Sequence, residues 1–140
     1  MSTKKVALIT GANKGLGFEI VRQLGQQGIT VVLGARDEAK GQAAAEKLKA
    51  EGIDAHSVKL DVTNAGDIAA LPGYFAANFG RLDILVNNAG IGIDNGLQTS
   101  PEAFRQTYET NVIAPWFIAQ ILLPLLKKPL KEKKVIFNPA

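Results

Sequence analysis

The chain has 140 residues, of which 46% are hydrophobic and 21% are charged, as is ordinary for a soluble globular domain with a buried core. It contains no cysteine, which excludes disulfides, thiol chemistry and cysteine-ligated metals. The net charge of +3 is mild, and the lysine-rich run 127–134 has no interleaved aromatic residue, which argues against a nucleic-acid-binding protein. We therefore expect residues 1–140 to form a single domain.

The N-terminus and the longest apolar stretch bear on where the protein is located. Met1–Lys5 is polar and leads into a short apolar run, unlike the apolar core of a signal peptide. The apolar stretch Ala114–Leu126 contains Gln120 and two prolines, and it is too short to span a bilayer. We expect a cytoplasmic protein that does not contact membranes.

Short, largely apolar runs predict strands of a parallel sheet. The five expected strands are Val6–Ile9, Ile29–Leu33, Ala55–Leu60, Leu82–Val86 and Val135–Phe137.

Between these runs, capping residues and apolar residues at helical spacing predict four helices. They are Gly15–Gln27, a helix that begins after Asp37 and stops at Gly52, Ala65–Asn78, and a long helix that begins after Ser100 and runs through Leu126. Pro72-Gly73 should break or kink the third helix. The fourth should bend near Pro115 and end near Pro124.

Strands that alternate with helices of this length are typical of a doubly wound α/β fold with right-handed crossovers. The expected fold is Rossmann-type, with a parallel sheet of five strands in the order 3-2-1-4-5. The ligand crevice of such a sheet lies at the carboxyl ends of strands 1 and 4, where the winding reverses. Two loops of this sequence, Thr10–Gly17 and Asn87–Gly90, fall there, and their convergence predicts a nucleotide site.

The first loop has the spacing G-x-x-x-G-x-G and lies between a strand and a helix. Gly11, Gly15 and Gly17 suit a tight turn, a close backbone approach to a pyrophosphate, and helix–strand packing. The helix N-terminus that follows offers amide donors and a positive dipole end to phosphates. The alternative is a glycine-rich turn that only connects the strand to the helix.

In the second loop, one of Asn87 and Asn88 should brace the sheet by bonding to neighbouring backbone. The other should border the cofactor through its main chain, with the small residues Ala89-Gly90 beside a sugar. Either asparagine could instead be a simple turn former.

The choice of cofactor is made at the end of strand 2, where an acidic residue would accept the ribose 2′-hydroxyl of NAD. Here Gly34-Ala35 holds that place and Arg36 follows, while Lys14 adds a second cation nearby. Two positive charges and no carboxylate favour the 2′-phosphate of NADP. Alternatively, Arg36 is a surface charge paired with Asp37 or Glu38.

Two further polar residues are candidates. Asp61, at the end of strand 3, could accept a hydrogen bond from the adenine amino group, or it could cap the next helix with Thr63 and Asn64. Asn111 lies inside the long helix, where asparagine is unfavourable, so it could hold a backbone carbonyl or an ordered water. It could instead mark a helix irregularity ahead of Pro115.

The long helix is apolar on more than one side, so it should be buried on two sides. One side can pack on the sheet, and the other needs a partner, most simply the same helix of a second copy. We expect a homo-oligomer, formed through helix 101–126 or through the edge of strand 5.

These motifs, in this order and spacing, resemble those of the short-chain dehydrogenase/reductase family. The resemblance rests on T-G-x-x-x-G-x-G from Thr10, D-V at Asp61-Val62, N-N-A-G from Asn87 and N-V at Asn111-Val112. Within the family, the Lys14 and Arg36 pattern is similar to NADP-dependent, carbonyl-reductase-like members. The match runs from Lys4 to about Phe137 and corresponds to the N-terminal half of a family member.

The resemblance implies hydride transfer between NADPH and a carbonyl or alcohol substrate. In the family a tyrosine acts as acid and base, a lysine lowers its pKa, a serine orients the substrate, and an asparagine, matched here by Asn111, supports a proton-relay water. Tyr74 and Tyr108 have no lysine four residues on, and the chain ends at Ala140. We expect it to lack the family's catalytic serine, tyrosine and lysine and to be inactive alone. The alternatives are a non-catalytic nucleotide-binding module and an interaction partner of a full-length relative.

By this resemblance the one catalytic candidate is Asn111, and no metal site is expected. The candidate NADP-binding residues are Gly11, Asn13, Lys14, Gly15, Leu16, Gly17, Arg36, Asp61, Val62, Asn88, Ala89 and Gly90.

Overall fold

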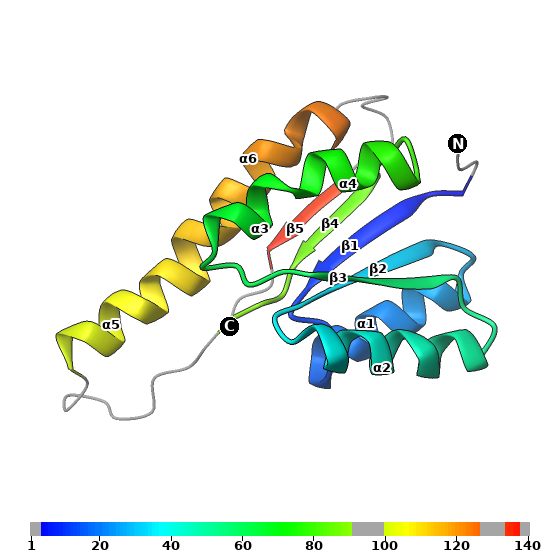
Figure 1. Ribbon diagram of the computed structural model, residues 1–140, viewed down its shortest axis with the longest axis horizontal. Coiled ribbons are helices and arrows are strands. Elements are labelled where there is room, and N and C mark those ends of the chain that lie inside the picture. The colour runs from blue at the N-terminus through cyan, green and yellow to red at the C-terminus, as the bar shows by residue number, and fades with distance from the viewer. Residues whose placement is uncertain (1–3, 91–99, 127–133, 138–140) are drawn as a thin grey trace.

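The computed structural model describes residues 4–90, 100–126 and 134–137, and it shows a five-stranded parallel sheet with helices on both faces (Figure 1). The strand order is β3-β2-β1-β4-β5, which confirms the order predicted for the Rossmann-type fold. The strands are β1 (Val6–Thr10), β2 (Thr30–Ala35), β3 (Ala55–Lys59), β4 (Ile84–Asn87) and β5 (Lys134–Phe137).

Helices α1 and α2 cover one face of the sheet, and the remaining helices cover the other (Figure 1). The helical segments are α1 (Gly15–Gln26), α2 (Glu38–Ala50), α3 (Ala65–Ala69), α4 (Leu71–Asn78), α5 (Pro101–Tyr108), the π-helical turn η2 (Glu109–Ile113) and α6 (Ala114–Leu126).

Strand β1 shows why the sheet has two cores. Successive side chains of a strand point to opposite faces, so Ala7 and Ile9 pack with Val21 on the α1–α2 side. Val6 and Leu8 pack with Phe75, Ile118 and their neighbours on the other side. Every residue of β1 is buried, as the continuous apolar run predicts for a central strand.

The predicted helix starts are confirmed, and the third helix is interrupted as expected. The Asp37 and Ser100 side chains accept hydrogen bonds from Lys40 N and Ala103 N and so cap α2 and α5. The third helix divides at Ala70 into α3 and α4, slightly before Pro72-Gly73, because proline is accommodated in the first turn of the new helix.

The long helix has the predicted extent, and the structure adds two details to it. The irregularity considered ahead of Pro115 is a π-helical turn, and the helix runs through Leu126 as predicted, so Pro124 lies within it and does not end it. Pro124 removes one donor to the helix ladder near its end, where it is exposed and water can satisfy the freed carbonyl.

The segments α5, η2 and α6 form one continuous helix of 26 residues. The prediction of a stretch too short for a bilayer covered only Ala114–Leu126, which is half of this helix. With a mean hydropathy of 1.3 over its most apolar window, this helix is long and apolar enough to cross a membrane by length and composition alone. A core helix of a soluble protein meets the same criteria, and Ala114, Ile118, Leu122 and Leu126 are buried in the core beneath it. The absence of membrane contact stays a prediction.

Candidate functional site

A cleft of about 550 Å³ opens at the carboxyl ends of the central strands. It brings together most of the site residues predicted from the sequence, with four residues that were not predicted. Its lining consists of Gly11, Asn13, Lys14, Gly15, Arg36, Leu60, Asp61, Val62, Thr63, Asn88, Ala89, Gly90, Gln106 and Thr110.

The two motif loops are tied together by the buried side chain of Thr10. The backbone amides of Asn88 and Ala89 both donate to Thr10 Oγ1 at 2.9 Å, and Asn88 Nδ2 donates to the Gly11 carbonyl at 3.1 Å. Asn88 therefore both braces the loops and lines the cleft. Asn87 is 3% exposed, and neither polar atom of its side chain has a hydrogen-bond partner among the described residues. The bracing expected of the pair thus comes from Asn88.

The glycines of the first loop are required by geometry. A Cβ on Gly11 would lie 2.8 Å from Ala89 Cα, and a Cβ on Gly17 would collide with the Asn88 side-chain amide. Gly15 has a φ of +63°, and a Cβ there would meet nothing within 4 Å. The loop is therefore packed closely against the second loop at its two ends and leaves open space at Gly15, beside the start of α1.

The N-terminus of α1 has no side-chain cap. Lys14 occupies the N-cap position in an extended conformation, without a side-chain hydrogen bond, and no acidic residue lies in the first turn. The first amide groups of a helix lack acceptors within it and carry the positive end of its dipole. Beside a cleft, such an end can receive a phosphate group.

Two cations lie at the cleft without an ion pair. Lys14 and Arg36 are exposed, and in the described part of the chain Arg36 forms no ion pair with Asp37 or Glu38. Asp37 instead caps α2. The end of β2 presents no carboxylate, so this corner of the cleft is positive.

Asp61 places a negative group in the same cleft, close enough to Arg36 to interact with its charge. Its Oδ1 accepts hydrogen bonds from Thr63 Oγ1 at 2.6 Å and from Thr63 N at 2.9 Å. These two bonds, with a smaller contribution from Arg36, hold the pKa of Asp61 below its usual value, so the carboxylate is charged at neutral pH. The helix-capping role considered for Asp61 belongs to Asn64, which accepts from Asp67 N at 3.0 Å.

Three predicted site residues lie outside the lining of the cleft. Leu16 is 62% exposed, Gly17 is buried between the loops, and Asn111 is partly buried in the π-helical turn. Conversely, the motifs missed Leu60, Thr63, Gln106 and Thr110. The last two lie four residues apart on the long helix, a spacing that marks one face but does not say which face meets the cleft.

Comparison with known proteins gives consistent matches. The sequence pattern of the family described as short chain dehydrogenase matches residues 5–137. Carbonyl reductase [NADPH] 1 of Mus musculus is 43% identical over 90% of this chain and 46% of its own length. The (+)-neomenthol dehydrogenase of Arabidopsis thaliana is 41% identical over 89% of this chain and 50% of its own length.

A solved structure agrees with the sequence matches. A metagenomic short-chain oxidoreductase crystallised in complex with NADP superposes with a TM-score of 0.84 at 34% identity, over 94% of this chain and 60% of that one. The chain thus spans about half the length of the two curated relatives above.

Proposed function

The chain belongs to the short-chain dehydrogenase family, and we propose that it is the NADP-binding part of an oxidoreductase that transfers a hydride between NADPH and a carbonyl or alcohol group. The observation that carries the proposal is the positive corner of the cleft, where Lys14 and Arg36 form no ion pair with any described residue and β2 ends without a carboxylate. The NADPH and NADP in the names of the relatives support the same cofactor.

The cleft residues fit the parts of this cofactor. The pyrophosphate would be held at the start of α1, where Gly15 leaves open space and the helix amides are uncapped. The 2′-phosphate would be held by Lys14 and Arg36 through charge-assisted hydrogen bonds. Asp61 and Val62 would lie beside the adenine.

The second loop would border the sugar on the reactive side of the cofactor. Asn88, Ala89 and Gly90 form a wall of small side chains and backbone at the cleft. Leu16 and Gly17 are proposed to contribute through the loop they complete. When bound, the cofactor supplies the hydride.

For proton transfer to the substrate, the described residues supply few suitable groups. Asn111 follows Thr110, which lines the cleft, and we assign it a supporting role in the family's proton relay. Tyr74 packs against Phe75 and Phe79, and burial raises its pKa, which makes it a poor acid at neutral pH. We therefore propose that these residues bind NADPH without reducing a carbonyl compound by themselves.

A second candidate function is association with another chain. Val112, Trp116, Phe117 and Leu123 on the long helix are 40–57% exposed although they are large and apolar. Such a surface favours a protein partner, either a second copy or a full-length relative.

Calorimetric titration of the chain with NADPH, followed by a turnover assay with a panel of aldehydes and ketones, tests the proposal. We expect NADPH binding in the micromolar range and no substrate-dependent NADPH oxidation. Absence of NADPH binding would overturn the cofactor assignment and leave association as the better function. Turnover would overturn the inactivity of the 140 residues.

A further inference from the structure

A second recess, of about 380 Å³, lies between α1 and α2 next to the cofactor cleft. Asn13, Lys14 and Phe18 line it from the side of α1, and Lys40, Ala44 and Lys47 line it from α2. Lys40 and Lys47 do not line the cofactor cleft, whereas Asn13 and Lys14 line both.

The three lysines of the recess, Lys14, Lys40 and Lys47, have no carboxylate partner among the residues that the structure describes. None of them forms an ion pair within residues 4–90, and no acidic residue lines the recess. Other lysines of the same region are paired: Lys49 with Glu46 at 3.3 Å and Lys59 with Asp67 at 2.8 Å. Like charges that line one concave, partly apolar surface reinforce each other's field toward an incoming anion.

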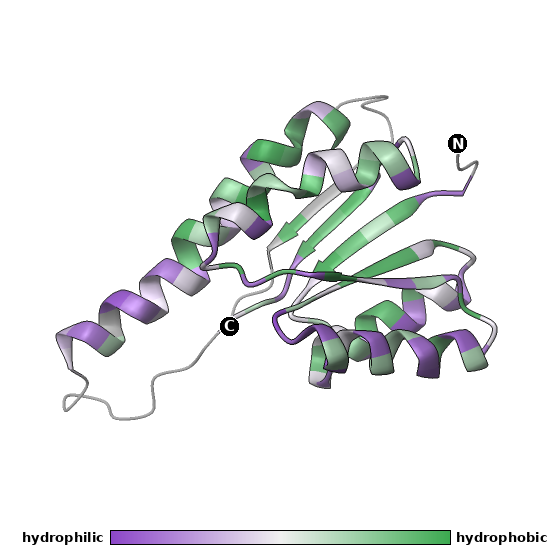
Figure 2. Ribbon diagram, viewed as in Figure 1, coloured by the Kyte–Doolittle hydropathy of each residue, from purple (hydrophilic) through white to green (hydrophobic). Residues whose placement is uncertain are grey.

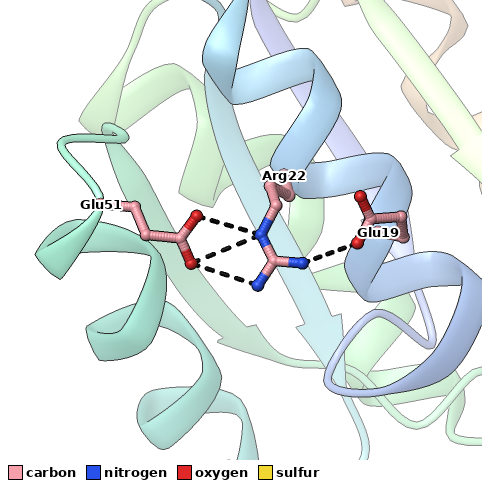
Figure 3. Close-up of polar contacts among 3 residues, drawn as sticks. All are labelled: Glu19, Arg22 and Glu51. Atoms are coloured by element: carbon pink, nitrogen blue, oxygen red, sulfur yellow. Dashed lines mark hydrogen bonds and ion pairs between the residues drawn. The ribbon is translucent and has the colours of Figure 1, made fainter.

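An ion pair links the two helices that line the recess. Arg22 of α1 donates from Nε to Glu51 Oε1 at 3.0 Å and from Nη2 to Glu51 Oε2 at 3.1 Å, which ties α1 to the end of α2 (Figure 3). The Arg22 guanidinium also lies 4.9 Å from the centre of the Phe18 ring and covers it. Ala44 is buried below the lysines, so the floor is apolar and the charges are at the rim.

The spacing of the cations favours an extended anion. Lys40 and Lys47 lie seven residues apart on α2, which is about 10 Å along the helix axis, and Lys14 faces them from the other wall. A compound with several phosphate groups in a row can meet all three, whereas a single phosphate neutralises only part of the set.

We propose that this recess is a binding site for a linear oligophosphate, separate from the cofactor cleft and sharing Lys14 with it. The Lys14 ammonium group cannot neutralise two phosphate groups at once. Oligophosphate binding therefore lowers the affinity of the cleft for NADPH, and NADPH binding lowers the affinity of the recess for oligophosphate by the same factor. The recess thereby makes cofactor binding sensitive to polyanions.

The test is a titration of wild type, K47Q and K49Q with tripolyphosphate, monitored by backbone amide chemical shifts in ¹⁵N–¹H spectra. Lys49 is the matched control because it lies on the same helix but pairs with Glu46 outside the recess. We expect shifts at Ala43 and Ala44, a loss of affinity of roughly fivefold in K47Q, and a change of less than about twofold in K49Q. This titration contains no cofactor, so its result does not depend on whether the chain binds NADPH.

Three results would overturn the proposal: no binding, shifts confined to the cofactor cleft, or equal losses in K47Q and K49Q, which would mean a diffuse charge effect. A second titration measures NADPH affinity with and without tripolyphosphate. We expect tripolyphosphate to weaken NADPH binding in wild type and to do so less in K47Q. Equal weakening in both proteins would show direct competition in the cleft and would overturn the coupling.

Discussion

Gly11, Gly15 and Gly17 meet two different physical demands within one loop. Gly11 is excluded from carrying a side chain by the approach of Ala89, and Gly17 by the Asn88 amide. A Cβ on Gly15 would meet no protein atom within 4 Å. Glycine is therefore required there by the left-handed φ of +63° and by the space that a bound ligand would need. Packing against the second loop explains Gly11 and Gly17 whether or not a ligand binds. Gly15 is therefore the position at which a ligand-binding role can be tested.

Substituting Gly15 by leucine tests that role, with Gly28 as the control. Gly28 also has a left-handed φ, of +85°, with nothing within 4 Å, but it lies at the end of α1 away from the cleft. Each of G15L and G28L should cost about 1–2 kcal/mol of unfolding free energy, because both impose the same backbone strain. NADPH affinity should be lost in G15L alone, as calorimetry would show. Similar NADPH affinities in the two variants would rule out a pyrophosphate at Gly15.

At this scale, the sequence predicted the cleft residues whose position follows from a local pattern. Gly11, Lys14 and Arg36 lie in the cleft because a loop or a strand end carries them there. The hydroxyl of Thr10, which accepts two amides from a loop more than seventy residues away, could not be predicted, because its role depends on which strands are neighbours. The same holds for Thr110, which a helix from another part of the chain brings to the cleft.

At the scale of elements, one buried carboxylate fixes the start of the central strands. Asp83, just before β4, accepts from Val6 N at 2.9 Å and from Arg81 Nε and Nη2 at 2.7 Å. Its side chain is 3% exposed, so the carboxylate is shielded from water, while the Arg81 side chain is 29% exposed. The beginnings of β1 and β4, and hence the register of the strands that carry both motif loops, depend on this contact.

Replacing Asp83 by asparagine should therefore destabilise the fold strongly. D83N removes the charge that balances Arg81 and places an amide donor against a donor, at an expected cost of about 3 kcal/mol. The control is E102Q, since Glu102 and Arg105 lie 3.9 Å apart and are 87% and 74% exposed. That change should cost less than about 0.5 kcal/mol. Urea denaturation would measure both, and comparable losses would contradict a structural role for Asp83.

Where helices begin and break was more predictable from the sequence than the backbone geometry within the long helix. Capping residues and prolines indicated where the helices begin and where the third one divides, because these signals act locally. A π-helical turn ahead of Pro115 was foreseen only as an irregularity. Its form depends on how the helix packs against the sheet, which local sequence does not encode.

At the scale of the whole molecule, the long helix presents an apolar surface that the described residues do not cover. Figure 2 shows hydrophobic residues over much of α6. Trp116 and Phe117 contact each other edge to face, with ring centres 5.4 Å apart, and are 57% and 51% exposed. Exposed aromatic residues of this kind are enriched in protein interfaces.

We predict that the chain self-associates through this helix at high micromolar concentration. W116E should shift the population toward monomer, because a buried charge would oppose the interface, whereas Q42E, at an exposed polar position of α2 on the opposite face of the sheet, should have a much smaller effect. Sedimentation velocity would measure all three proteins. A strictly monomeric wild type would contradict the prediction, and a W116E dimer would move the interface to another surface, such as the edge at β5.

The measurement that tests the proposed cofactor site most directly is the affinity of the chain for NADPH and for NADH, in wild type and in R36Q. The two cofactors differ only in the 2′-phosphate, which the positive corner of the cleft is proposed to hold. We expect wild type to bind NADPH at least roughly tenfold more tightly than NADH. We expect R36Q to lose most of that difference while its NADH affinity stays the same. Equal affinities in wild type, or a preference that survives in R36Q, would contradict the assignment of the cleft to NADP through Arg36.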